Sequence, residues 1–216
     1  MNSLIHIYNM SDIRNYFKPK KTVDTKDTKN TKNTMVSNDT MDSKNSNVIT
    51  IFTDGSSLNN GQKNKYQSGG IGIYIEDTKE CISEKLIGKI TNNIAELKAC
   101  IKGIQVIMNR ENYNNEVIKI YSDSEYVINS ITKWALNWSK NNWQKYDKKK
   151  KGKCDIKNKE LIIELFNLYN KYPIHFIHTK AHTIKPTDTN TKEYNIWYGN
   201  YMADKLAVQG SHQDPL

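Results

Sequence analysis

The stretch VITIFTDGSS, residues 48–57, puts a charged side chain where the sequence otherwise indicates buried structure. Its first five residues are mostly apolar and predict a core strand, but the run stops at Asp54, followed by a glycine and two serines. Asp-Gly is a strong turn signal, so the aspartate has an ordinary explanation at the end of a strand. A carboxylate in this place also suits one half of a metal site. These residues alone fit both interpretations, and the rest of the chain is needed to choose.

The composition restricts the class of protein before any further motif is considered. The chain has 216 residues, enough for one domain of about 150 residues with extra segments. Its net charge of +9 favours a polyanionic partner, such as nucleic acid or an anionic membrane surface. No apolar run could span a membrane and no signal peptide begins the chain, so we expect a soluble, intracellular protein. Three scattered cysteines without a CxxC pair argue against a disulfide scaffold or a cysteine zinc site.

The first 47 residues differ in composition from the rest of the chain. From about residue 18 onward they are Lys, Thr, Asn, Asp and Ser, with almost no large apolar side chains. Such a segment cannot bury enough surface to offset the entropy of ordering it. We therefore predict a disordered extension over residues 1–47, an ordered domain over residues 48–210 and a tail over residues 211–216.

The ordered region alternates between two hydrophobic periods. Period-two or short apolar runs predict strands at residues 48–53, 69–76, 81–87, 117–123 and 174–178. Helical spacing predicts helices at residues 94–108, 124–131, 157–171 and 197–208. Short loops between the first three strands indicate an antiparallel meander. The order of elements predicts an α/β protein with a mixed sheet and helices packed on it.

Four carboxylates stand at marked positions in this pattern. Asp54 and Asp123 end strands, Glu96 lies near the start of a helix, and Asp204 lies at the edge of an apolar helix face. Each has an ordinary explanation: a turn for Asp54, a helix N-cap for Asp123, the helix dipole for Glu96 and a surface charge for Asp204. If the four converge, they must be neutralised by protons or cations, and carboxylate oxygens suit Mg²⁺ or Mn²⁺. Their positions in the sequence do not show whether they converge.

Seven blocks of the sequence resemble ribonuclease H of type 1, the cellular and bacterial ribonuclease HI family. The blocks are FTDGSS, GGIGIYI, TNNIAELKACIKGI, IYSDSEYVINSITKW, KNKELI, FIHTKAH and NYMADKLA, in the family's order over Val48–Val208. The resemblance implies a ribonuclease H-like fold, a five-stranded mixed sheet with three antiparallel strands then two parallel, and helices on both faces. It implies a monomeric endonuclease that hydrolyses the RNA strand of RNA–DNA hybrids, leaves 3′-hydroxyl and 5′-phosphate ends, and removes primers or R-loops during replication.

The resemblance also assigns roles to the carboxylates. Asp54 would bridge two Mg²⁺ ions, for which Mn²⁺ can substitute. Asp123 and Glu96 would hold the ion on the leaving-group side, and Asp204 would hold the ion that carries the attacking water. His182 matches the family's catalytic histidine, which helps proton transfer and product release, as an imidazole can near neutral pH.

His182 has two other interpretations. It could be a solvated loop histidine, or it could join His175 and His178 in a zinc cluster. Alternation along a strand argues against the cluster, because it sends His175 and His178 to opposite faces. The family's short glycine-containing loop after this histidine is replaced here by the longer TIKPTDTNTKEYNIWYG, residues 183–199. The position of His182 therefore depends on how that segment folds.

The resemblance implies a set of contacts with the hybrid. The residues assigned to it are Gly55, Ser56, Thr91, Asn92, Asn93, Trp143, Lys145 and Asn200. Asn92 and the backbone at Gly55 and Ser56 would recognise the 2′-hydroxyl, which marks RNA against DNA. Thr91 and Asn93 would contact the DNA strand, and both also suit helix capping.

The stretch ITKWALNWSKNNWQKYDKKKKGK, Ile131–Lys153, resembles the family's basic protrusion, which holds the DNA strand. Taken without the resemblance, its tryptophans would pack a helix pair and its lysines would form a solvated loop. We expect Trp134 and Trp138 to be largely structural, and Trp143 and the lysines, Lys145 among them, to lie nearer the hybrid.

The N-terminal extension carries a separate motif. In MSDIRNYFKPK, Met10–Lys20, Ile13, Tyr16 and Phe17 have the spacing i, i+3, i+4, so one helical turn presents all three on one side. The segment resembles a sliding-clamp-binding motif, with Met10 where glutamine is usual; its alternative is a stray amphipathic turn.

Two other function classes are weighed against the nuclease. One is a hybrid-binding accessory with an inactive site, against which the complete set of four carboxylates argues. The other is a transposase or integrase relative, which shares carboxylates but lacks the TNN, tryptophan and KAH blocks.

Overall fold

A five-stranded mixed sheet forms the centre of the protein, for which we have a computed structural model that describes residues 48–58 and 68–213. The strands are β1 (Val48–Leu58), β2 (Ser68–Ile75), β3 (Glu80–Ile87), β4 (Val117–Ser122) and β7 (Ile174–His178). Their order is β3-β2-β1-β4-β7, with β1, β2 and β3 antiparallel and β1, β4 and β7 parallel. This confirms the predicted mixed sheet. The motif at residues 10–20, the rest of the extension and the end of the tail lie outside the described residues.

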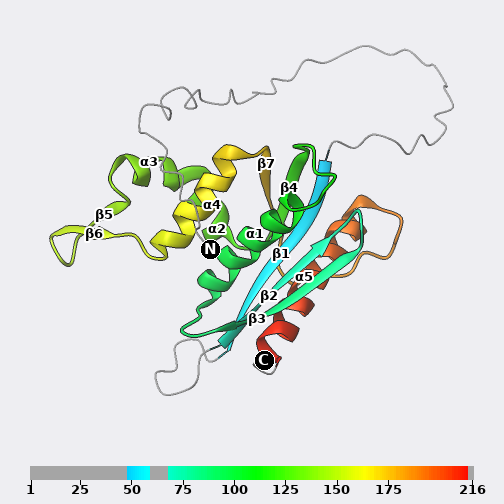
Figure 1. Ribbon diagram of the computed structural model, residues 1–216. Helices are drawn as coiled ribbons and strands as arrows, with labels where there is room; N and C mark the ends of the chain where they lie inside the picture. The colour runs from blue at the N-terminus through cyan, green and yellow to red at the C-terminus, as the bar shows by residue number, and fades with distance from the viewer. Residues whose placement is uncertain (1–47, 59–67, 214–216) are drawn as a thin grey trace, which may run out of the picture. The chain divides into compact units, whose positions relative to one another are not determined.

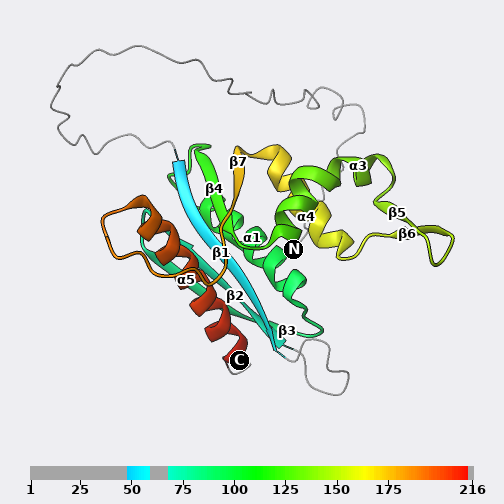
Figure 2. The same cartoon turned by 180° about the vertical axis from the view of Figure 1, so that it is seen from behind.

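Helices cover both faces of the sheet, as predicted. They are α1 (Asn92–Met108), α2 (Glu125–Asn129), the π-helical turn η2 (Ser130–Trp134), α3 (Ala135–Lys140), α4 (Lys159–Lys171) and α5 (Lys192–His212). Figures 1 and 2 show α5 against one face of the sheet and α1 against the other, with α4 beyond α1. No helix in the described part of the chain is long and apolar enough to cross a membrane.

Alternation along β1 supplies both sides of the core. Ile49 and Ile51 join a large cluster with α1 and α4, whereas Phe52 points to the opposite face. There it stacks on Tyr121, with ring centroids 4.8 Å apart, and packs with residues of α5. Burying such apolar surface contributes about 25 cal/mol per Å², so both helix layers are held to the sheet mainly through these side chains.

A glycine on β2 allows α5 to lie directly on the sheet. A Cβ added to Gly72 would come within 2.0 Å of the carbonyl oxygen of Ala203, far closer than real Cβ contacts. Gly72 is also the residue that pairs with Asp54 across β1 and β2. The residue after Ala203 is Asp204, so this close approach brings the acidic residue of α5 to the part of the sheet that carries Asp54.

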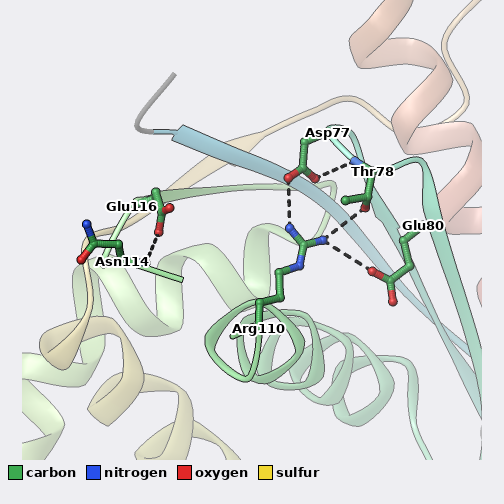
Figure 3. A network of polar contacts seen from close by, with 6 residues as sticks. All are labelled: Asp77, Thr78, Glu80, Arg110, Asn114 and Glu116. Carbon is green, nitrogen blue, oxygen red and sulfur yellow. Dashed lines mark hydrogen bonds and ion pairs between the residues drawn. The ribbon is translucent and has the colours of Figure 1, made fainter. Parts of the chain in front are cut away.

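An ion-pair network joins the end of α1 to the turn between β2 and β3. Figure 3 shows the Arg110 guanidinium directed at Asp77, at the Thr78 hydroxyl and at Glu80, with nitrogen–oxygen distances of 3.0, 3.2 and 3.5 Å. The Arg110 side chain is only 18% exposed, so screening by solvent is weaker here than at the surface. The network fixes the C-terminal end of α1.

Parts of the structure differ from the sequence prediction. A second, two-stranded sheet forms between β5 (Gln144–Asp147) and β6 (Gly152–Asp155), in the lysine-rich stretch where no strand was predicted. Asp147 organises its turn, because its carboxylate accepts hydrogen bonds from the backbone N–H groups of Lys149 and Lys150. The last helix was predicted at residues 197–208, but α5 begins at Lys192, where the Thr191 side chain caps it, and ends at His212.

Candidate active site

Asp54 lies within a strand and not at a turn. β1 continues past Asp54 to Leu58, and Asp54, Gly55 and Ser56 all pair with β2. The interpretation of Asp54-Gly55 as a turn that ends the strand is therefore wrong. The glycine is required for a different reason, since a Cβ on Gly55 would lie 2.2 Å from the backbone nitrogen of Glu96. Without a side chain at residue 55, β1 touches the backbone of α1, and Asp54 and Glu96 come together.

Asp123 is brought to the same place by the parallel pairing of β1 and β4. β4 ends at Ser122, so Asp123 leaves the sheet beside the central strand. One carboxylate oxygen from each of Asp54, Glu96 and Asp123 lies within 4.8 Å of the others. Within residues 48–58 and 68–213 no other group of three His, Cys, Asp or Glu residues comes together in this way. Two sheet strands and one helix thus build a three-carboxylate cluster.

The ordinary explanations for the other acidic residues do not account for this cluster. The N-cap of α2 is Ser124, whose hydroxyl accepts a hydrogen bond from the Val127 backbone N–H, so Asp123 does not cap that helix. Glu96 lies beyond the first turn of α1, where no acidic residue is present. It is also buried, with 9% of its surface exposed, which is unusual for a carboxylate without a paired cation.

Asp204 faces the same hollow from α5. The hollow has a volume of about 560 Å³ and takes in all four predicted carboxylates. Its lining consists of Asp54, Gly55, Ser56, Ser57, Asn92, Glu96, Asp123, His182, Thr183, Trp197, Asn200, Tyr201 and Asp204. The structure therefore gathers nine residues that the sequence singled out: the four carboxylates, His182, Gly55, Ser56, Asn92 and Asn200.

The electrostatics of the hollow favour protons or cations. Burial, followed by the neighbouring Asp123 and Asp204, raises the pKa of Asp54 from 3.8 to about 6. Burial and the charge of Asp54 raise the pKa of Glu96 well above its ordinary value. Burial also raises the pKa of Asp123, an effect that His182 partly offsets. These carboxylates are thus ionised together only at a cost that a bound cation removes.

The residues present fit a hard divalent cation. The donor set consists of carboxylate oxygens without sulfur, which suits Mg²⁺ or Mn²⁺. Glu96 Oε2 is buried and has no hydrogen-bond partner, so an acceptor atom is left for an ion to use. A histidine zinc cluster finds no support here, because His175 and His178 lie exposed on β7 and belong to no ligand group among the described residues.

Several predicted substrate contacts lie outside the hollow. Thr91 caps α1, accepting from the Ile94 N–H, and Asn93 is exposed in the first turn of the same helix. Trp143 is half-buried and packs edge-on against Phe166, with centroids 5.8 Å apart. Lys145 is exposed on β5. Trp138 packs against the core, as expected, and so does Trp143, whereas Trp134 is 41% exposed.

Four lining residues were missed by the sequence interpretation: Ser57, Thr183, Trp197 and Tyr201. Ser57 donates a short hydrogen bond to the Asn92 side chain and so orients it. The two aromatic residues repeat at helical spacing, four apart, within the helix predicted at residues 197–208, so the signal was available in the sequence. Ser57 follows another serine on β1 and gave no comparable sign.

The chain is similar to known ribonucleases H. A family model described as RNase H matches residues 45–212. A Ribonuclease H of Clostridium botulinum is 38% identical over 160 residues, covering 74% of this chain and 92% of the relative. A Ribonuclease HI of Haemophilus ducreyi is 34% identical over 170 residues, covering 78% of this chain and 93% of the relative.

Two solved structures share the fold. The foamy viral protease-reverse transcriptase in complex with dsDNA superposes with a TM-score of 0.55 at 29% identity, covering 76% of this chain and 94% of the matched chain. LC9-RNase H1, a type 1 RNase H, superposes with a TM-score of 0.56 and covers 76% of this chain and 72% of its own. At 19% identity the second likeness concerns the fold alone.

Proposed function

The chain belongs to the RNase H family and is a ribonuclease H, which cleaves RNA in RNA–DNA hybrids. We propose that it acts as an endonuclease by two-metal-ion catalysis at the four-carboxylate hollow. One observation carries the proposal: three carboxylates from β1, α1 and the end of β4 present oxygens within 4.8 Å of one another. The partnerless Oε2 of buried Glu96 supports it, because an acceptor in that position calls for a cation.

The four carboxylates would hold two Mg²⁺ ions, and Mn²⁺ would substitute. Such ions, when bound, supply an activated water and neutralise the charge that develops on the phosphate oxygens. Asp54 suits the bridging position, because it lies on the central strand and interacts with both Asp123 and Asp204. Asp123 and Glu96 would serve the leaving-group side, and Asp204 the side of the attacking water.

His182 would hold or transfer a proton at the phosphate. Its ring shares the hollow with Asp123, and an imidazole changes charge near neutral pH. Protonation of the leaving oxygen yields a 3′-hydroxyl, and attack by water on phosphorus leaves a 5′-phosphate. The carboxylates bind and orient, and the histidine handles the proton.

Recognition of RNA would use the rim of the hollow. Asn92, held by Ser57, and the backbone at Gly55 and Ser56 would contact the 2′-hydroxyl, with Asn200 on the opposite wall. The remaining proposed contacts, with the DNA strand, come from Thr91, Asn93, Trp143 and Lys145. Of these, the lysine on the β5–β6 hairpin is the exposed cation, suited to phosphate.

A cleavage assay tests the proposal. Labelled RNA–DNA hybrid, duplex DNA and duplex RNA are each incubated with Mg²⁺ and the wild-type protein, Asp54→Asn or Asp77→Asn. We expect wild type to cut only the RNA of the hybrid, Asp54→Asn to lose detectable cutting, and Asp77→Asn, an aspartate in the β2–β3 turn, to retain it. If Asp54→Asn still cuts the hybrid, the proposal is refuted. If the wild-type protein binds the hybrid without cutting it, the protein is an accessory protein. If the wild-type protein cuts duplex DNA, it is a transposase-like nuclease.

We further propose that Met10–Phe17 binds a sliding clamp, which would direct the enzyme to primers or R-loops during replication. The support is the spacing of Ile13, Tyr16 and Phe17 and the long polar segment behind them. A clamp pull-down compares wild type with Tyr16→Ala/Phe17→Ala. Loss of retention in the double variant is expected, and equal retention contradicts the proposal.

A further inference from the structure

An aromatic ladder runs along the first part of α5. It consists of Tyr194, Trp197 and Tyr201, which follow one another at intervals of three and four residues. The Trp197 and Tyr201 rings are stacked, 5.3 Å apart and 8° from parallel, and Tyr194 lies 5.7 Å from Trp197. Two members of the ladder, Trp197 and Tyr201, line the hollow that contains the four carboxylates. The ladder therefore belongs partly to the wall of the active site.

The indole of Trp197 makes a directed contact with the loop that precedes α5. Its Nε1–H donates to the backbone carbonyl of Thr183 over 3.0 Å. Thr183 directly follows His182, the proposed proton-transfer residue, and both line the hollow. The hydrogen bond thus fixes the backbone one residue away from the imidazole, at a point where the loop meets the helix.

A cation reinforces the same attachment. The Lys185 ammonium lies over the rings of Trp197 and Tyr194, 5.7 and 5.8 Å from their centroids. Such cation–π contacts add to the attraction between the loop and the helix. Two residues of the loop, 183 and 185, are therefore tied to the ladder, one through a backbone carbonyl and the other through a side chain.

The loop needs such attachment at this point. His182 has a φ of 49°, in the left-handed region that non-glycine residues rarely adopt. This conformation is strained for an L-residue, so it persists only when neighbouring contacts hold it. The hydrogen bond from Trp197 holds the carbonyl group of the following residue, Thr183, where it opposes a return to ordinary backbone geometry.

We propose that Trp197 is a positioning residue, which sets the place of His182 over the carboxylates through the carbonyl of Thr183. The inference rests on the proposed function, because it gives His182 the proton-transfer role. Placement matters in such a role, since a displacement of about 1 Å can lower a rate by about 100-fold. Trp197 thereby contributes to catalysis without touching the reacting atoms.

Trp197→Phe tests the inference, because it keeps an aromatic ring and removes the N–H. We expect kcat on a Mg²⁺-supported hybrid substrate to fall by about 3- to 30-fold, with KM changed less than about twofold. Tyr194→Phe is the matched control: it removes one polar group from the same ladder, leaves the Thr183 contact in place and should retain wild-type kcat. Equal kcat values for Trp197→Phe and wild type overturn the inference.

A double variant separates positioning from a general loss of structure. In a His182→Ala background, Trp197→Phe should cause no further fall in kcat, because the residue that it positions is absent. A fall of the same factor in both backgrounds overturns the inference. The NMR resonance of His182 Hε1 in the metal-free protein gives a readout that is independent of activity. We expect this resonance to shift in Trp197→Phe and to keep its position in Tyr194→Phe. An unshifted resonance in Trp197→Phe contradicts the positioning role.

The two proposals fail in different experiments. Cleavage by Asp54→Asn would remove the proposed site, whatever the behaviour of Trp197. Loss of cleavage in Asp54→Asn, together with additive effects of Trp197→Phe and His182→Ala, would leave the site intact and refute only the positioning role.

Discussion

Asp54 is subject to opposing demands from folding and from catalysis. As a residue of the central strand it is held beside Asp123 and Asp204 in a largely buried place, which raises its pKa to about 6. Catalysis with bound cations instead needs the ionised carboxylate. In the absence of metal the ionised form of Asp54 is therefore a source of instability, and a neutral isostere relieves it.

Replacing Asp54 by asparagine should separate the two demands. We expect Asp54→Asn to lose hybrid cleavage while raising the free energy of unfolding of the metal-free protein at neutral pH by roughly 1–3 kcal/mol. Thermal unfolding in the presence of EDTA measures the change, with Glu111→Gln as the control for loss of one exposed negative charge. A metal-free Asp54→Asn protein less stable than wild type would show that repulsion at the cluster is not the dominant effect of this side chain.

Gly55 should tolerate no side chain. Its missing Cβ leaves the space in which the backbone of α1 at Ala95 and Glu96 approaches β1. Gly55→Ala must push the helix away, at a cost of about 1–3 kcal/mol in the free energy of unfolding. Because the shift separates Asp54 from Glu96, cleavage should fall as well.

Gly152→Ala serves as the control for stability, because a Cβ there would meet only one backbone oxygen, at 3.8 Å. Denaturant unfolding of the two variants checks the prediction. Equal midpoints for Gly55→Ala and wild type would mean that β1 and α1 can separate without loss.

At the scale of elements, the β5–β6 hairpin carries much of the positive charge near the helices. Lys145 lies on β5, Lys153 on β6 and Lys149 in the turn, all exposed. We expect the triple change of these lysines to Gln to raise KM for the hybrid about 3- to 10-fold at 0.1 M salt, with kcat unchanged, and to reduce the salt dependence of binding. The matching triple change to Arg keeps the charge and should keep KM; an equal rise in both triple variants would argue against phosphate contact.

The elements also show how far the sequence could be interpreted. Strands β1, β4 and β7 were predictable because apolar runs mark them, and so was α1, although the sequence left Thr91, Asn92 and Asn93 open as its cap and the structure identifies Thr91. The β5–β6 hairpin was not, since its order comes from Asp147 and the turn and not from hydrophobic alternation. The start of α5 was hidden among threonines, of which only the structure identifies Thr191 as the cap.

The same division holds at the active site. Sequence patterns picked out all four carboxylates as separate residues with separate ordinary explanations, and only the resemblance to ribonuclease H grouped them into one site. What joins them is tertiary: parallel pairing of β1 with β4, the contact of Gly55 with α1, and the contact of Gly72 with α5. The turn interpretation of Asp54 failed because local signals from Asp-Gly were overridden by pairing of β1 with β2 out to Leu58.

On the scale of the whole molecule, the chain carries a net charge of +9 and also contains an acidic hollow. The excess of basic residues favours a nucleic acid backbone, whereas the hollow repels it unless cations are bound. Metal binding, stability and productive substrate binding are therefore linked, and the linkage has a definite dependence on pH.

The stabilising effect of Mg²⁺ should grow as the pH rises. The pKa of Asp54 in the folded protein, about 6, exceeds its ordinary value of 3.8, so its contribution to metal-free stability is fully present at low pH and is lost as the pH rises through 6. Mg²⁺ binds the ionised form and restores what was lost. Thermal unfolding with Mg²⁺ or EDTA should thus show a small gain in Tm from Mg²⁺ at about pH 5 and a larger gain at about pH 7.5.

The paired difference removes titrating groups away from the hollow from the comparison, because their titration is the same with and without the ion. Asp54→Asn provides the matched control: its amide neither titrates nor binds Mg²⁺ strongly, so both the gain and its pH dependence should shrink. A wild-type gain that is equal at the two pH values would show that Mg²⁺ does not act through the carboxylates of the hollow. A gain that grows with pH in wild type but not in Asp54→Asn would tie the stability of the whole molecule to the same side chain that makes it a nuclease.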